Sequence, residues 1–107
     1  MDDSTSSPAK PSGPHLPLAK VLPVISSIPR WHILRELAKG EPLPVHEIAR
    51  RMRFSPTSIS KHLAILFDSG VVRRGYGCLY SIEPAFLVPG ERAMDFGNVL
   101  IRFDRMA

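Results

Sequence analysis

Two apolar stripes separated by a short turn, between Pro44 and Gly70, constrain the fold of this chain more than any other feature. Over Val45 to Met52, apolar residues recur at the spacing of one helix face. A second helix is expected after Ser55, because serine is a favoured N-cap and Pro56 suits the first helical position. Gly70 suits its C-terminal cap. The segment therefore predicts two packed helices, with buried positions at Val45, Ile48, Ala49 and Met52 in the first and at Ile59, Leu63, Leu66 and Phe67 in the second, and with Phe54 filling the core between them.

A β-hairpin pattern follows the second helix directly. Val71 to Arg74 and Cys78 to Ile82 are rich in β-prone residues, and Gly75-Tyr76-Gly77 between them offers positive-φ positions for a tight turn. A helix, a turn, a helix and a basic two-stranded wing make up a winged helix-turn-helix, whose second helix enters the major groove of DNA. We therefore predict an α+β fold, mostly α: a winged helix-turn-helix with a two-stranded wing.

The remaining segments suggest how the chain is organised around this motif. The 107 residues have room for one domain with a small core. Residues 1–15 are rich in Ser and Pro and lack hydrophobic periodicity, so we expect a disordered tail there. Residues 16–90 are expected to form the DNA-binding domain, and residues 91–107 a C-terminal dimerisation or packing segment.

Two of these segments leave open questions of secondary structure. The apolar stretch 16–28 favours a helix that is broken or restarted near Pro23, since an interior proline costs about 3 kcal/mol. Its apolar surface is also large enough to bury a partner chain. A further helix is predicted over Pro29 to Lys39, with Trp31 and Leu34 on its inward face. Residues 93–103 fit either a helix or a strand, and we favour a strand because of Gly97 and the run Val-Leu-Ile at 99–101.

Positive charge is concentrated on the helix-turn-helix and wing. Residues 30–80 hold nine Lys or Arg and four Asp or Glu, a net charge of nine minus four, or +5, while the whole chain carries +4. A polyanion would be neutralised on this part of the molecule. Arg50, Arg51 and Arg53 are expected to point to solvent, and Arg53 adds charge at the turn between the two helices.

The outward side of the second helix carries hydroxyl groups and one lysine. With Ile59 and Leu63 turned inward, Thr57, Ser60 and Lys61 lie opposite, and Ser58 flanks them. Such groups reach phosphates and base edges, and the helix N-terminus itself attracts phosphate. We expect Lys61 to be the principal contact. The alternative is a well-capped surface helix without a ligand.

The ordered string S-x-S-K-H-L-x-x-L, followed by Gly70, Val-Val-Arg-Arg and the hairpin, resembles the arsenical-repressor (ArsR-like) family of winged-helix regulators. The resemblance spans about residues 24–83 and is carried by I-P-R-W-H-I-L-R-E-L at 28–37, V-H-E-I-A-R-R-M at 45–52, S-P-T-S-I-S-K-H-L-A-I-L at 55–66 and G-V-V-R-R at 70–74. It implies a dimeric repressor that pairs through terminal segments and releases its operator when an effector binds. It also implies that His62 lies in or beside the major groove with its neighbours. The predicted DNA-contacting residues are Arg50, Arg51, Arg53, Ser55, Thr57, Ser58, Ser60, Lys61, His62, Arg73, Arg74 and Tyr76.

The chain departs from the metal-sensing members of that family. Those proteins carry Cys-x-Cys in the first helix of the motif, or Asp, His and Glu ligands near the C-terminus, whereas here Val45 to Met52 holds only His46. One cysteine, Cys78, cannot assemble a thiolate site, so no metal or cofactor is predicted. We expect Cys78 to be an inert, half-buried thiol rather than a redox-active one. Tyr76 at the wing tip is either a minor-groove contact or a plain turn residue.

Other function classes fit the sequence less well. No Ser/His/Asp order, carboxylate pair or phosphate-binding glycine loop suggests an enzyme. No apolar run reaches the roughly 18 residues of a membrane span, and no signal peptide is evident, so a cytoplasmic protein is expected. We therefore predict a sequence-specific regulator of double-stranded DNA, a homodimeric repressor with an unknown effector. The alternative is a winged helix that binds another protein and does not bind DNA.

Overall fold

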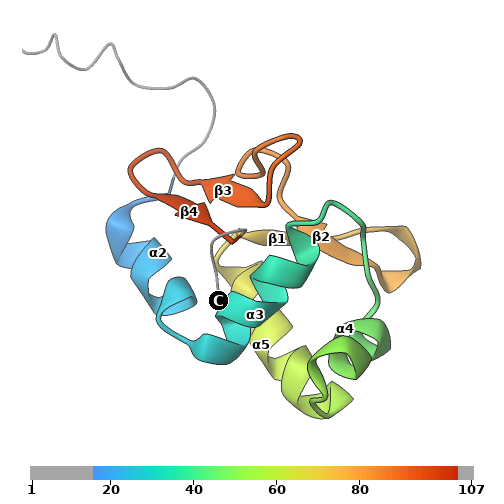
Figure 1. Cartoon of the computed structure of the whole chain (residues 1–107). Helices are drawn as coiled ribbons and strands as arrows, with labels where there is room; N and C mark the ends of the chain where they lie inside the picture. The colour runs from blue at the N-terminus through green and yellow to red at the C-terminus, as the bar shows by residue number, and fades with distance from the viewer. Residues whose placement is uncertain (1–15, 104–107) are drawn as a thin grey trace, which may run out of the picture.

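The computed structural model describes residues 16–103, in which four helices precede two small antiparallel hairpins (Figure 1). The tail predicted at residues 1–15 lies outside the described residues. No described helix is long and apolar enough to cross a membrane. In chain order the elements are α2 (Leu18–Ile25), α3 (Ile28–Leu37), α4 (Val45–Met52), α5 (Pro56–Asp68), β1 (Val72–Arg74), the 3₁₀ turn η2 (Tyr76–Cys78), β2 (Tyr80–Ile82), β3 (Ala93–Asp95) and β4 (Leu100–Arg102).

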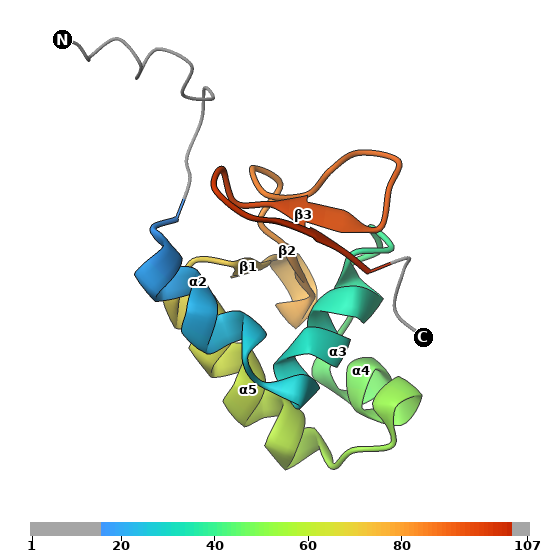
Figure 2. The same cartoon turned by 60° about the vertical axis from the view of Figure 1, so that its left-hand side comes forward.

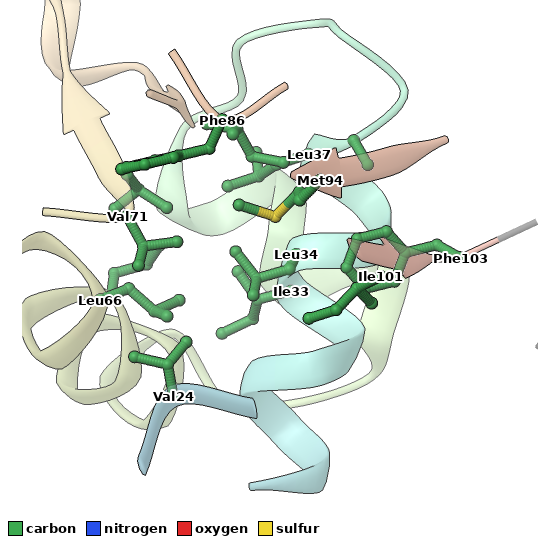
Figure 3. Close-up of a cluster of buried hydrophobic side chains, with 14 of the residues drawn as sticks. Val24, Ile33, Leu34, Leu37, Leu66, Val71, Phe86, Met94, Ile101 and Phe103 are labelled. Atoms are coloured by element: carbon green, nitrogen blue, oxygen red, sulfur yellow. The ribbon is translucent and has the colours of Figure 1, made fainter. Parts of the chain in front are cut away.

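The helix α3 lies at the centre of the fold, in contact with α2, α4, α5 and β2. Its side chains Ile33, Leu34 and Leu37 are fully buried or nearly so. Figure 3 shows Ile33 and Leu34 between Leu66 of α5 on one side and Ile101 of β4 on the other. Every helix and both hairpins therefore contribute to one continuous core, as a small domain requires.

The helix α2 differs from the prediction at Pro23. A break near Pro23 was expected, but the helix runs through this residue to Ile25, and the chain restarts at Ile28 with Ser27 as N-cap. Proline removes one N–H donor, which leaves the carbonyl of Ala19 without its helical partner. Both Ala19 and Pro23 are exposed, so water can solvate that carbonyl. The buried residues Val21 and Val24 hold the helix to the core on its other side.

Two phenylalanines predicted to be buried lie on the surface. Phe54 is 41% exposed and does not fill the core between α4 and α5, and Phe67 is 49% exposed. Phe67 follows Leu66 directly, so its side chain points about a quarter of a turn away from the buried stripe. The buried side of α5 is formed by Ile59, Leu63 and Leu66 alone.

The wing is the predicted two-stranded hairpin. Strands β1 and β2 pair Val72 with Ile82 and Arg74 with Tyr80, and Leu43 forms a further bridge to Tyr80 on the other edge of β2. Gly77 has a positive φ of 76°, as expected, but Gly75 does not, and Cys78 takes a positive φ of 60° instead. The backbone N–H of Gly75 donates to the carbonyl of Leu79 at 2.8 Å and closes the tip.

The C-terminal segment forms a second hairpin, in line with the preference for strand over helix. Strands β3 and β4 are antiparallel, and the N–H of Phe96 donates to Val99 at 2.9 Å in the turn between them. Its inward residues are buried, and the ring of Phe103 meets Trp31 of α3 edge to face, with ring centroids 5.4 Å apart. Both views place this hairpin on the side of the molecule opposite α4 (Figures 1 and 2).

Candidate nucleic-acid interface

The outward side of α5 is polar and exposed. Ile59, Leu63 and Leu66 anchor the helix with no exposed surface. This orientation leaves the predicted contact residues at solvent, namely Ser55, Thr57, Ser58, Ser60 and Lys61, together with Pro56 and Ala64. No described element covers this side. The arrangement can present hydroxyl and ammonium groups to a ligand whose groove is wide enough to admit a helix.

Ser55 fixes where this helix begins. Its Oγ accepts a hydrogen bond from the backbone N–H of Ser58 at 3.1 Å, and Pro56 occupies the first helical position. Ser55 therefore has a capping role, and its hydroxyl hydrogen remains available to a ligand. The first turn of α5 is open to solvent, so its remaining backbone N–H groups and the helix dipole favour an anion there.

Arg53 forms the turn between α4 and α5. It adopts a left-handed conformation (φ 60°, ψ 39°), and its backbone N–H donates to Arg50 at 3.3 Å. A left-handed residue after the last helical turn reverses the chain direction without a longer loop. The guanidinium of Arg53 is exposed beside the start of α5.

Arg50 and Arg51 are engaged with carboxylates of the same chain. Glu47 accepts from Arg50 Nε at 3.1 Å and from Arg51 Nε at 2.8 Å. These hydrogen bonds, first from Arg50 and then from Arg51, lower the pKa of Glu47 to about 2. Arg51 also lies 3.6 Å from the buried Glu36 and 3.5 Å from Glu41. Sequence reasoning missed Glu47, although its i,i+3 and i,i+4 spacing to the two arginines signals such pairs.

The wing presents two more arginines and an aromatic ring. Arg73 and Arg74 are exposed on β1, and Tyr76 at the tip is 100% exposed. Arg74 Nη2 lies 3.1 Å from the Cys78 Sγ, and this hydrogen bond raises the pKa of Arg74. Cys78 is exposed, so the expectation of a half-buried thiol was wrong.

His62 lies apart from the other predicted contacts. It is half-buried, and its Nδ1 has no hydrogen-bond partner among the described residues. Burial, and then the charge of Arg30, lower the pKa of His62. Arg30 in turn donates from Nη2 to the carbonyl of Pro23 at 3.1 Å. His62 therefore faces the junction of α2 and α3 rather than the outward side of α5.

Two further properties of the surface bear on function. Over residues 16–103, no group of three or more His, Cys, Asp or Glu side chains gathers where a metal ion could bind. Apolar side chains are exposed where α2 meets α3, with Leu22 at 49% and Ile28 at 73%. A groove of about 380 Å³ runs between α2 and α5, and Pro23 and Ile65 are among its lining residues.

Comparison with known proteins agrees with this geometry. Residues 27–75 match the MarR family, and the match spans α3 to β1. Among solved structures, HlyU from Vibrio cholerae N16961 is 23% identical with a TM-score of 0.56, over 78% of this chain and 82% of that one. At this identity the likeness is evidence of the fold alone. No curated protein sequence matches the chain.

Two other solved structures are similar at somewhat higher identity. The transcriptional repressor BigR from Xylella fastidiosa is 25% identical with a TM-score of 0.54, over 62% of this chain and 69% of that one. An ArsR family transcriptional regulator, RHA00566, is 29% identical with a TM-score of 0.53, over 62% and 75%. What these proteins share is the winged helix of transcription regulators, and the predicted fold class is confirmed. The comparisons support a DNA-binding regulator, and none of the similar proteins named here is described as an enzyme.

Proposed function

We propose that this protein is a sequence-specific regulator of double-stranded DNA, a cytoplasmic homodimeric repressor of the ArsR-like type. Residues 55–69 would lie in the major groove, and the wing, residues 71–82, on the backbone or in the minor groove. The supporting observation is the exposed hydroxyl-and-lysine side of α5, with Arg53 at one end of the helix and the basic wing following its other end. The likeness to a regulator described as a repressor and to an ArsR family regulator supports the finer assignment.

Each group on this surface has a chemical role in the proposal. Lys61 neutralises a phosphate or donates to a guanine edge, and the hydroxyls of Thr57, Ser58 and Ser60 donate to or accept from bases and phosphates. Arg73 and Arg74 neutralise phosphates beside the groove that α5 enters, because they are exposed on the strand that follows this helix. Tyr76 extends the contact at the wing tip.

The homodimer is proposed to form through the apolar surface of α2 and its junction with α3. Leu22 and Ile28 expose more apolar surface there than a helix held to its own core requires. Residues 91–103 are assigned to packing rather than dimerisation, because Phe96, Ile101 and Phe103 are buried within the same chain. Two recognition helices about 34 Å apart would then read successive major grooves of a pseudo-palindromic site.

The test is selection of bound duplexes from a random library, followed by titration against salt and a mass measurement of the complex. Lys61→Ala should weaken binding and reduce the salt slope by about one per protomer. Arg92→Ala removes an exposed charge near the second hairpin, so it should change neither quantity. We expect two chains per selected duplex.

Failure of every duplex to show salt-dependent binding would overturn the proposal. Capture of a protein partner that persists in a Lys61→Ala, Arg73→Ala double variant would then favour the interaction-module alternative. One chain per duplex would remove the homodimer from the proposal and leave DNA binding intact. Equal effects of Lys61→Ala and Arg92→Ala would show that α5 is not the contact surface.

A further inference from the structure

Glu47 forms ion pairs with both arginines of α4. Its carboxylate contacts both Arg50 and Arg51, which lie three and four residues further along the same helix. The side chain of Glu47 is 24% exposed and that of Arg50 is 71% exposed. A phosphate that reaches the exposed Arg50 would therefore meet the negative charge of Glu47 beside the guanidinium, which offsets much of the attraction.

Arg51 is held more firmly than Arg50. It lies within 4 Å of three carboxylates, on Glu47 of its own helix, on Glu36 of α3 and on Glu41 of the linker between them. Glu36 is almost fully buried, and its Oε1 also lies 3.0 Å from the Nζ of Lys39. The guanidinium of Arg51 thus joins α4 to α3, and releasing it to bind DNA would leave the buried Glu36 with fewer partners.

The other basic groups near α5 differ in this respect. Across residues 16–103, no carboxylate lies within ion-pair distance of Arg53, Lys61 or Arg73. These three cations are available to phosphates without breaking an internal pair. The predicted basic contacts therefore fall into two groups. Arg50 and Arg51 are paired with carboxylates, whereas Arg53, Lys61 and Arg73 are not paired with any in this described range.

We propose that Glu47 limits the electrostatic affinity of the helix-turn-helix for DNA by neutralising Arg50, so that binding depends on the available cations and on the polar side of α5. The inference rests on the proposed DNA-binding function. Non-specific binding is almost entirely electrostatic, whereas specific binding adds contacts to bases. An internal carboxylate that removes one cation from the surface therefore lowers the affinity for any duplex, and the loss is a larger fraction of the total binding free energy on random sequence.

The test compares Glu47→Gln with the wild type on a selected duplex and on random duplex, over a range of salt. Arg51 keeps Glu36 and Glu41 in the variant, so one guanidinium, that of Arg50, is released per protomer. The salt slope should steepen by about 0.9 per protomer, which is about threefold in affinity between roughly 200 and 50 mM salt. Random duplex should gain at least as much as the selected duplex.

Two further variants identify the group responsible. Arg50→Gln alone should change the slope little, while the double variant Glu47→Gln, Arg50→Gln should return the slope to the wild-type value. Glu41→Gln serves as the matched control, because this exposed carboxylate has one contact, at 3.5 Å, with Arg51 and none with Arg50 among the described residues. Thermal midpoints confirm that each variant is folded.

An unchanged slope in Glu47→Gln, or a gain that survives in the double variant, overturns the role of Glu47. A loss of slope in Arg50→Gln as large as that in Lys61→Ala does so as well, because it would mean that Arg50 binds phosphate in the wild type. Elution from immobilised heparin separates this failure from failure of the proposed function. A wild type that binds no duplex refutes DNA binding, whereas later elution of Glu47→Gln than of Glu41→Gln would still show that Glu47 masks a cation.

Discussion

Replacing Phe103 by alanine tests whether the second hairpin is part of the core. Phe103 is 2% exposed, and its ring lies 5.4 Å from that of Trp31 at an interplanar angle of 67°. Truncating a buried phenylalanine removes its transfer free energy and leaves a cavity, which together cost about 3–5 kcal/mol. An edge-to-face ring pair contributes about 0.5–1.5 kcal/mol of such a loss. We expect the free energy of unfolding to fall by at least about 3 kcal/mol.

Trp31 is the single tryptophan of the chain and reports on this contact directly. Urea unfolding followed by its fluorescence and by circular dichroism gives the free energy of unfolding from two independent signals. Leu100→Ala is the matched control: Leu100 lies in β4 but is 56% exposed, so it should cost within about 0.5 kcal/mol. Each variant is measured at several protein concentrations, because a dimer shifts the apparent stability.

If Phe103→Ala is no less stable than Leu100→Ala, the hairpin is not held by the core, and the packing role assigned to residues 91–103 is wrong. Phe103→Leu separates the two contributions, since it keeps most of the apolar volume and loses the ring pair. Its loss should be smaller than that of alanine.

Two further perturbations probe α5 itself. Ser55→Ala removes its N-cap and should cost about 1 kcal/mol in thermal unfolding, whereas Ser60→Ala, on the exposed side, should change stability little; equal losses would contradict the capping role. Because burial and the charge of Arg30 lower the pKa of His62 below 6.5, the unfolded state binds more protons, so this contribution to stability is present above about pH 6.5 and is lost as pH falls. His62→Gln should flatten the pH dependence of the thermal midpoint; an unchanged profile in this variant would refute the reasoning.

The parts of the fold that sequence predicts best are those where one pattern has one structural solution. Helical spacing, a serine cap and a following glycine defined α5 to within a residue or two, because each signal acts locally. The wing was predicted equally well, because two β-prone runs separated by a short glycine-containing turn have few alternatives to a hairpin.

The differences arise where tertiary context decides. Strands β3 and β4 have three residues each, too few for alternation to distinguish them from a helix turn, and their pairing is fixed by the core that they cover. Phe54 and Phe67 were assigned to the interior on hydrophobicity, but 41% and 49% of their surfaces stay exposed. The helix α2 tolerates Pro23 because buried valines outweigh one missing hydrogen bond, a balance that sequence alone does not give.

Counting charges in the sequence also misses tertiary context, and this omission affects the prediction of function. The net charge of the helix-turn-helix suggests many equivalent contacts to phosphate, but Arg51 joins α4 to α3 and Arg50 is paired with Glu47. The contact between Arg51 and Glu36 joins the first helix of the motif to the core, and both pairs reduce the number of cations free to bind. A surface with few free cations depends more on its polar side chains, and under the proposed function these are the exposed hydroxyls near the start of α5. The carboxylates of α3 and α4 therefore lower the electrostatic, sequence-independent part of any affinity for a polyanion, and they leave the exposed hydroxyls of α5 unchanged.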